Sequence, residues 1–186
     1  MRVIAGKVRR MTLVAPAGMD VRPTTDRIKE TLFNIIQYDL PGCLFLDLFA
    51  GSGGIGIEAI SRGAEKAVFV DKNKDALRCI EQNLEHTGLT DEAEILPMDA
   101  VMAIKNLAKR GRVFDIVFMD PPYEHDMEKP VLDALYDYGI VDENSIVIVE
   151  TSDRTDISSW DNDRYSVYRV KKYKTNQHVF LKFNKK

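Results

Sequence analysis

Short apolar runs alternate with amphipathic stretches through the middle of the chain, from Asp47 to Glu150. The runs are rich in Val, Ile, Leu and Phe, as in strands that are buried on both faces. They predict strands at residues 43–49, 67–71, 93–96, 113–119 and 145–150. This alternation is typical of a parallel sheet covered by helices, so the predicted fold class is α/β.

The clearest helix signal lies between the second and third of these strands. Leu77, Ile80 and Leu84 recur at helical spacing. Asn73 stands where an N-cap is expected, and Gly88 stands where a helix would stop. The pattern therefore predicts repeated βαβ units.

The beginning of the chain differs from this central part. Residues 2–5 and 8–14 flank Gly6-Lys7 and predict a small basic β-hairpin. A helix with an apolar stripe from Ile28 to Ile36 should follow, and Thr24 or Thr25 can cap it. We expect these elements to form an N-terminal extension over residues 1–40.

The end of the chain predicts two further strands, at residues 165–173 and 177–183, around Thr175-Asn176. They should join the far edge of the sheet as an antiparallel pair. With 186 residues the chain can bury one substantial core. We therefore expect a single domain over residues 1–186, with its core at 41–186.

Composition excludes several classes of protein. No apolar run approaches the roughly 20 residues that span a bilayer, and the start has no apolar segment of signal-peptide length. A soluble cytoplasmic protein without a membrane partner is expected. The two cysteines, Cys43 and Cys79, are 36 positions apart, and the three histidines are scattered. Neither a disulfide scaffold nor a metal site is predicted.

The formal net charge of -3 conceals a marked asymmetry. Residues 1–30 carry 7 basic and 3 acidic side chains, residues 31–163 carry 11 and 26, and residues 164–186 carry 8 and none. Basic ends around an acidic middle can mean that the ends hold a polyanion on one face. They can equally mean that exposed ends are charged for solubility.

A glycine-rich turn follows the first central strand. Gly51, Gly53 and Gly56 have the spacing G-x-G-x-x-G between that strand and a predicted helix. Such a turn lets the backbone approach a ligand closely, and the helix start offers free N–H groups. It can also be merely a tight turn. Asp71 ends the next strand, where its carboxylate can accept both hydroxyl hydrogens of an adenosine ribose.

Two further carboxylates help to distinguish between the two kinds of cofactor that bind to such a loop, S-adenosylmethionine and a dinucleotide. Asp47 lies inside the strand before the glycines, where a phosphate site has no need of an anion but a cofactor with an ammonium and a sulfonium does. This favours S-adenosylmethionine over a dinucleotide. Asp99 follows the third strand and can accept from an adenine amino group. It can equally be the N-cap of a helix over residues 100–110.

The most specific motif is Asp120-Pro121-Pro122-Tyr123, which ends the fourth strand. Consecutive prolines fix an extended turn and leave carbonyl oxygens without neighbouring N–H partners. The Asp120 carboxylate and the Pro121 carbonyl can each accept one hydrogen of an exocyclic amine, while the Tyr123 ring stacks on the base. The motif therefore predicts methyl transfer to a nucleobase amine, with Asp120 also able to take the departing proton. The plain alternative is an ordinary turn.

These motifs together resemble a known family. Residues 22–34, the loop from Asp47 to Gly53 and the motif from Asp120 to Tyr123 are similar to the bacterial enzymes that methylate the 2-amino group of a guanine in small-subunit ribosomal RNA. The resemblance runs over nearly the whole chain. It implies a Rossmann-like methyltransferase fold, with a mostly parallel seven-stranded sheet, and S-adenosylmethionine as the cofactor. It assigns cofactor binding to Asp47, Ala50, Gly51, Gly53, Asp71 and Asp99, and catalysis to Asp120, Pro121, Pro122 and Tyr123.

One position departs from some members of that family, which have phenylalanine where this chain has Tyr123. Tyrosine is also usual in adenine methyltransferases, so a DNA or RNA adenine-N6 methyltransferase is the main alternative. Its DNA-acting members usually carry a separate target-reading region, for which this chain has little room. A non-catalytic nucleic-acid-binding relative is disfavoured by the intact motif, and a nicotinamide-dependent oxidoreductase by Asp47.

The resemblance gives the basic ends a use as an RNA-binding surface, with ribosomal RNA in a small subunit or its assembly intermediate as the partner of a monomer. The residues expected to contact phosphates are Arg9, Arg10, Arg22, Arg27, Lys29, Arg169, Lys171, Lys172 and Lys174. Tyr168 and Tyr173 can stack on bases, although packing in the edge strands is favoured. The segment from Arg22 to Thr25 can form a lid over the cofactor, or its threonines can simply cap the helix.

Overall fold

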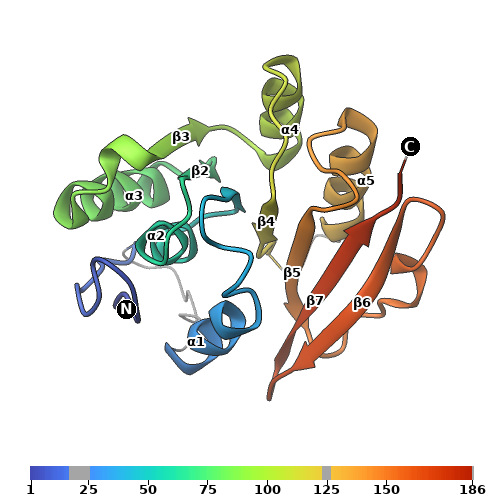
Figure 1. Ribbon diagram of the computed structural model, residues 1–186, viewed down its shortest axis with the longest axis horizontal. Helices are drawn as coiled ribbons and strands as arrows, with labels where there is room; N and C mark the ends of the chain where they lie inside the picture. Colours follow the sequence, from blue (N-terminus) through green and yellow to red (C-terminus); the bar gives the residue numbers. More distant parts are fainter. Residues whose placement is uncertain (17–25, 123–126, 186) are drawn as a thin grey trace.

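The structure is a computed structural model that describes residues 1–16, 26–122 and 127–185. Its centre is a seven-stranded sheet in the order β3-β2-β1-β4-β5-β7-β6 (Figure 1). The strands are β1 (Leu44–Leu48), β2 (Lys66–Asp71), β3 (Ala93–Pro97), β4 (Ile116–Met119), β5 (Ile146–Ser152), β6 (Tyr165–Lys172) and β7 (Asn176–Phe183). The first five are mutually parallel, and β7 pairs antiparallel with both β5 and β6. The predicted α/β class and the antiparallel C-terminal pair are confirmed.

Two groups of helices cover the sheet, one on each face. The helices are α1 (Asp26–Ile35), α2 (Gly54–Ser61), α3 (Lys74–Thr87), α4 (Ala100–Lys109) and α5 (Glu128–Tyr138). Phe45 and Phe69 point into the core shared with α1, α2 and α3. Their sequence neighbours Leu46 and Val68 point into the core shared with α4 and α5. This alternation explains why the central strands are continuous apolar runs.

Both predicted ends of α3 are confirmed. The Asn73 side chain accepts from the N–H groups of Asp75 and Ala76, and Gly88 ends the helix in the left-handed conformation at φ 69°. Both signals depend only on neighbouring residues, so they can be recognised in the sequence.

The predicted hairpin around Gly6-Lys7 forms, but its paired part is shorter than predicted. Val3 N donates to Met11 O and Leu13 N donates to Met1 O, both at 2.9 Å, on either side of an antiparallel bridge between Arg2 and Thr12. Beyond this pairing the chain reverses through successive turns over residues 6–10, and this loop bonds to a helix. Lys7 N donates to Ser61 O at 2.8 Å, and Val8 N donates to Ser61 Oγ at 3.2 Å. A Cβ on Gly6 would lie 1.8 Å from Ser61 O, so only glycine permits this approach.

A buried carboxylate ties the same segment to the helices. Glu58 in α2 accepts from Ile4 N at 2.8 Å and from Ala5 N at 3.0 Å. It also pairs with Lys29 Nζ at 3.1 Å and with Arg62 Nε at 2.7 Å, and both Glu58 and Lys29 are fully buried. Desolvation lowers the pKa of Lys29, an effect that the Glu58 carboxylate opposes. Lys29 is therefore part of the core, and its expected contact with RNA is wrong.

The fourth central strand begins at Ile116, three residues later than predicted. Phe114 N donates to Ile140 O, beyond α5, and Val113 is exposed, so these residues do not extend the ladder. Among the described helices, none is long and apolar enough to cross a membrane.

Candidate active site at the carboxyl edge of the sheet

The carboxyl ends of the parallel strands form one edge of the sheet, and the predicted site residues gather there. β1 leads into the glycine loop, Asp71 ends β2, Asp99 follows β3 and Asp120 follows β4. Open α/β sheets bind ligands at this edge. Tyr123 and Arg22 lie outside the described residues.

The glycine loop has the geometry that its spacing predicts. Gly51 at φ 57° and Gly53 at φ 76° are left-handed, and Gly53 caps α2. Phe49 is also left-handed, at φ 62°, which is a strained conformation for a residue with a side chain. A Cβ on Gly56 would lie 2.3 Å from the Phe69 ring, so this glycine lets α2 pack closely against β2. Ala50 N donates to Val70 O and so holds the start of the glycine loop against the end of β2.

Asp47 is buried beneath this loop, at 1% exposure. Its Oδ2 accepts from Gly56 N at 2.9 Å, and within the described residues Oδ1 has no hydrogen-bond partner. Burial raises the pKa of Asp47 to about 7, and the nearby Asp71 carboxylate adds to the increase, although the Gly56 N–H opposes it. A buried carboxylate of this kind favours a cationic ligand.

Asp71 and Asp99 already serve the backbone. The two oxygens of Asp71 accept from Gly51 N at 2.9 Å and from Asn73 N at 2.8 Å. Asp99 Oδ1 caps α4 by accepting from Met102 N at 3.0 Å. The capping interpretation of Asp99 is therefore confirmed. A carboxylate has about four lone-pair positions, so both side chains keep capacity for a ligand.

Asp120 stands half-buried at the end of β4 and is followed by a buried Pro121 and an exposed Pro122. Within the described residues, its carboxylate makes no hydrogen bond. Burial, together with the Glu150 and Asp47 carboxylates, raises the pKa of Asp120 well above its usual range. The side chain is thus a pair of acceptors without partners in the described structure, with an increased affinity for a proton.

Sequence reasoning missed two ionisable residues beside Asp120. Glu150, near the end of β5, and His178, in β7, are both buried, with 3.0 Å between Glu150 Oε2 and His178 Nε2. The signal available in the sequence was a carboxylate at the end of an apolar strand. Its partner on β7 was not recognisable because His178 approaches only through an antiparallel pairing between distant segments.

The basic residues are not all at this edge. Lys171 and Lys172 are exposed and end β6, which runs parallel to β5, so they lie at the carboxyl edge. α1 runs beside α2 in the same direction, because Lys29 pairs with Glu58 and the Arg62 guanidinium lies 5.0 Å from the Phe33 ring centre. The exposed Arg27, in the first turn of α1, is therefore also at this edge.

Arg9 and Arg10 lie at the other end of α2. Their loop is bonded to Ser61, the last residue of α2, and its Lys7 pairs with Glu92, just before β3 begins. This is the amino edge of the sheet, and Figure 1 shows the N-terminal loop well apart from the tips of β6 and β7. The structure therefore separates the predicted RNA-binding residues into two groups.

The two tyrosines near the C-terminal strands pack against protein side chains. Tyr173 Oη lies 3.2 Å from His178 Nδ1, and the Tyr168 ring contacts Phe180 with 6.2 Å between ring centres. The prediction that both tyrosines pack in the edge strands is confirmed by these contacts, although Tyr168 remains about half exposed.

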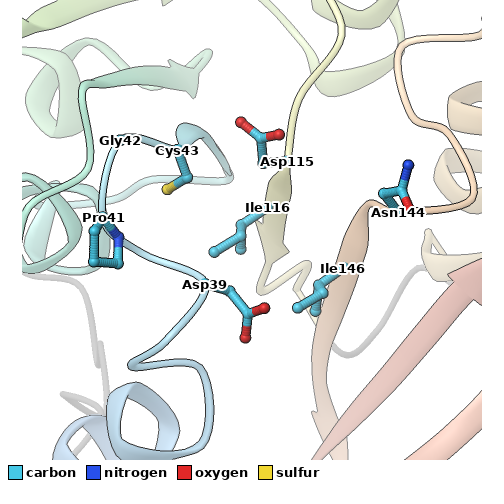
Figure 2. A pocket seen from close by; sticks show the side chains of 8 residues that line it. All are labelled: Asp39, Pro41, Gly42, Cys43, Asp115, Ile116, Asn144 and Ile146. Carbon is cyan, nitrogen blue, oxygen red and sulfur yellow. The ribbon is translucent and has the colours of Figure 1, made fainter.

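A shallow pocket at the amino edge is separate from this site. Figure 2 shows side chains from the segment before β1 and from the starts of β4 and β5, including Asp39, Cys43 and Asp115. Burial raises the pKa of the Cys43 thiol to about 12, so the thiol stays protonated and is a poor nucleophile. Among the residues that the structure describes, no cluster of three or more His, Cys, Asp or Glu side chains can hold a metal ion.

Known proteins that are similar to this chain are named as methyltransferases. The chain is 42% identical over 150 residues to the Bacillus subtilis protein named "Putative rRNA methyltransferase YlbH", covering 81% of this chain and 82% of that one. It is 34% identical over 151 residues to "Ribosomal RNA small subunit methyltransferase D" of Haemophilus influenzae, covering 81% and 78%. A solved structure described as "Putative methyltransferase yhhF from Escherichia coli" superposes with a TM-score of 0.85, at 28% identity over 100% of this chain and 99% of that chain.

The fold and the site thus define a methyltransferase with the Rossmann-like fold of S-adenosylmethionine-dependent enzymes. One family model, described as "Conserved hypothetical protein 95", matches residues 1–182. The chain belongs to that family.

Proposed function

We propose that this protein transfers a methyl group from S-adenosylmethionine to the exocyclic 2-amino group of a guanine in small-subunit ribosomal RNA. The observation that carries the proposal is the half-buried Asp120 carboxylate, which stands beside Pro121 and next to the strand that leads into the glycine loop. The names of the similar proteins from B. subtilis and H. influenzae support an RNA substrate.

The residues around the glycine loop fit the cofactor. Asp47 would hold its ammonium group, Gly51 and Gly53 allow the close backbone approach, and Ala50 lies between them and β1. Asp71 would bind the ribose hydroxyls, and Asp99 would accept from the adenine amino group. The bound cofactor supplies a methyl group on a sulfonium, which is an electrophile that needs no metal ion.

Asp120 and the Pro121 carbonyl would orient the guanine amine. The lone pair of this amine is delocalised into the base, so the free amine is a poor nucleophile. Two acceptors can draw the nitrogen toward tetrahedral geometry and direct its lone pair at the methyl group, and positioning of this kind can supply up to about 7–11 kcal/mol. Pro122 stiffens the turn, and Tyr123 is proposed from the sequence to stack on the base.

The basic groups would hold the RNA. Arg27, Lys171 and Lys172 lie at the carboxyl edge and can contact phosphates close to the target base, whereas Arg9 and Arg10 can contact a more distant part of a large substrate. Arg22 is included on its sequence position. The substrate is a small ribosomal subunit or its assembly intermediate, and the protein acts on it as a cytoplasmic monomer.

Replacing Asp120 by Ala tests the catalytic assignment. Turnover should fall by about 100-fold or more, because one of the two acceptors is lost, while cofactor affinity stays within about threefold. Asp115→Ala is the matched control, since Asp115 lies at the amino end of the same strand and accepts from Leu44 N. Methyl transfer to small subunits and calorimetric titration with the cofactor measure the two effects. A collapse of cofactor affinity in Asp120→Ala would instead place Asp120 in the cofactor site.

A further inference from the structure

A buried polar cluster lies next to Asp120 and has no part in the function described so far. Its centre is Glu150, whose Oε1 accepts from Asn176 Nδ2 and whose Oε2 lies 3.0 Å from His178 Nε2. The other ring nitrogen of His178 lies 3.2 Å from the hydroxyl oxygen of Tyr173. Both oxygens of Glu150 are therefore fixed, and its carboxylate has one defined position.

The sheet register places this carboxylate beside Asp120. Met119 pairs with Val149, so the next residues along the two parallel strands are Asp120 and Glu150. Glu150 in turn pairs directly with His178 on β7. Phe118, Ile148 and Phe180 share the sheet face that carries α1, α2 and α3. Asp120 and Glu150 follow two positions later in β4 and β5, and His178 lies two positions earlier in the antiparallel β7, so all three are next on that face toward the carboxyl edge. The three side chains thus form a row on one face, at the carboxyl edge.

The charged groups around this row are of both signs. Asp120 is influenced by Asp47 from β1 and by Glu150 from β5. Glu150 faces His178 on β7 and Tyr173 after β6, and Arg169 on β6 acts on Tyr173. Burial and the Glu150 carboxylate raise the pKa of Tyr173 to about 12, so its hydroxyl stays protonated. From the β5 side, the Glu150 carboxylate is the described charge that acts on Asp120.

We propose that Glu150, held by Asn176 and His178, is a positioning residue for methyl transfer, whose fixed negative charge keeps Asp120 able to accept the proton that the amine releases. This inference rests on the proposed function. Within the described residues, Asp120 and Glu150 share no hydrogen bond, so Glu150 acts through its charge.

The step balances without a further reactant. The amine nitrogen forms a bond to the methyl carbon as the bond between that carbon and the donor sulfur breaks, and the bonding electron pair stays on sulfur. The nitrogen becomes positively charged and then gives one proton to the ionised Asp120. A like charge nearby increases the proton affinity of a carboxylate, so Glu150 favours this last transfer. Product release lets Asp120 return the proton to solvent.

A ¹³C NMR titration of the aspartate carboxyl carbons tests the proposal on the cofactor-free protein. The Asp120 signal is assigned by its absence in Asp120→Asn. In Glu150→Gln its midpoint should fall by about one pH unit, because a neighbouring negative charge is removed. Glu150→Asp keeps the charge and should keep the midpoint close to that of the unmodified protein.

Glu128→Gln is the matched control. Glu128, in α5, is also a buried carboxylate near the end of β5. It accepts from Thr151 Oγ1, and Thr151 faces the opposite side of the sheet from its sequence neighbour Glu150. This variant should leave the Asp120 midpoint unchanged. An equal shift of the Asp120 midpoint in Glu128→Gln and Glu150→Gln would overturn the proposal, since loss of any nearby buried carboxylate would then have the same effect.

The titration keeps the proposal falsifiable even if Glu150→Gln does not fold. An Asp120 midpoint near its ordinary value of about 4 in the unmodified protein would overturn it without any variant of Glu150. The test is also independent of substrate. A shifted midpoint with no methyl transfer to any RNA would refute the proposed function and leave the role of Glu150 toward Asp120 standing. Where turnover is measurable, the acid limb of its pH profile should move with the midpoint.

Discussion

Asp47 shows how one residue can serve both the fold and the site. Its Oδ2 accepts from Gly56 N and so holds the start of α2 on β1, while its burial makes the ionised form costly. The sequence predicted a carboxylate for a cationic cofactor at this position. It could not show the bond to Gly56, because that bond depends on how the glycine loop turns.

Replacing Asp47 by Asn should stabilise the cofactor-free protein in a pH-dependent way. The pKa of Asp47 is about 7 in the folded protein and about 4 in an unfolded chain, so the folded state binds the proton more tightly. Stability from this residue is complete below pH 4 and is lost as the pH rises through 7. The substituted asparagine side chain cannot ionise, and its amide oxygen can still accept from Gly56 N.

The melting temperature of Asp47→Asn relative to the unmodified protein should therefore rise between pH 5 and pH 8. The difference in unfolding free energy at pH 8 is at most on the order of 4 kcal/mol. Thermal unfolding at the two pH values measures it. If the difference in melting temperature between the two proteins is the same at pH 5 and pH 8, Asp47 is not protonated in the folded protein. Cofactor affinity should be strongly reduced in the same variant.

At the scale of elements, features that depend on neighbouring residues could be predicted from the sequence, whereas features that depend on contacts between distant segments could not. Asn73 and Gly88 gave both ends of α3, and the apolar runs gave the central strands. The paired part of the N-terminal hairpin is shorter than predicted, because its loop bonds to Ser61 in α2. The buried pair of Lys29 and Glu58 was missed for the same reason, since each residue alone is typical of an exposed helix surface.

Glu58→Gln should be strongly destabilising. The substitution leaves Lys29 buried without an opposite charge and weakens the bonds to Ile4 N and Ala5 N. Loss of one partner of a buried pair costs about 3–5 kcal/mol. Chemical denaturation measures the cost, with the exposed Glu65→Gln as a control of little effect. Amide exchange at Ile4 and Ala5 should also become faster. A cost below about 1 kcal/mol would mean that the pair is not part of the stable core.

At the scale of the whole molecule, the basic ends of the chain do not form one surface. The end of β6 and the first turn of α1 lie at the carboxyl edge, whereas the loop with Arg9 and Arg10 is fixed at the amino edge. The charge counts alone could not separate these groups, because the topology decides to which edge each segment leads. A substrate must be large to reach both.

Two double charge reversals distinguish the groups. Lys171→Glu with Lys172→Glu should weaken binding both to whole small subunits and to a short RNA that contains the target loop. Arg9→Glu with Arg10→Glu should weaken binding to the subunit only. Removing one ion pair with a phosphate should reduce the slope of log affinity against log salt by about 0.9. Binding titrations at several salt concentrations measure both effects. Equal losses of affinity for the short RNA would show that the loop lies close to the target base.

The central claim is tested most directly by the identity of the methylated nucleoside. The protein would be incubated with tritiated S-adenosylmethionine and with small ribosomal subunits, their RNA stripped of protein, or duplex DNA, each from cells that lack this gene. Digestion to nucleosides should place the label in 2-methylguanosine from the subunits. Label in N6-methyladenine from DNA would contradict the account and favour an adenine methyltransferase. Absence of label from every substrate, with cofactor binding intact, would instead indicate a protein that binds nucleic acid without modifying it.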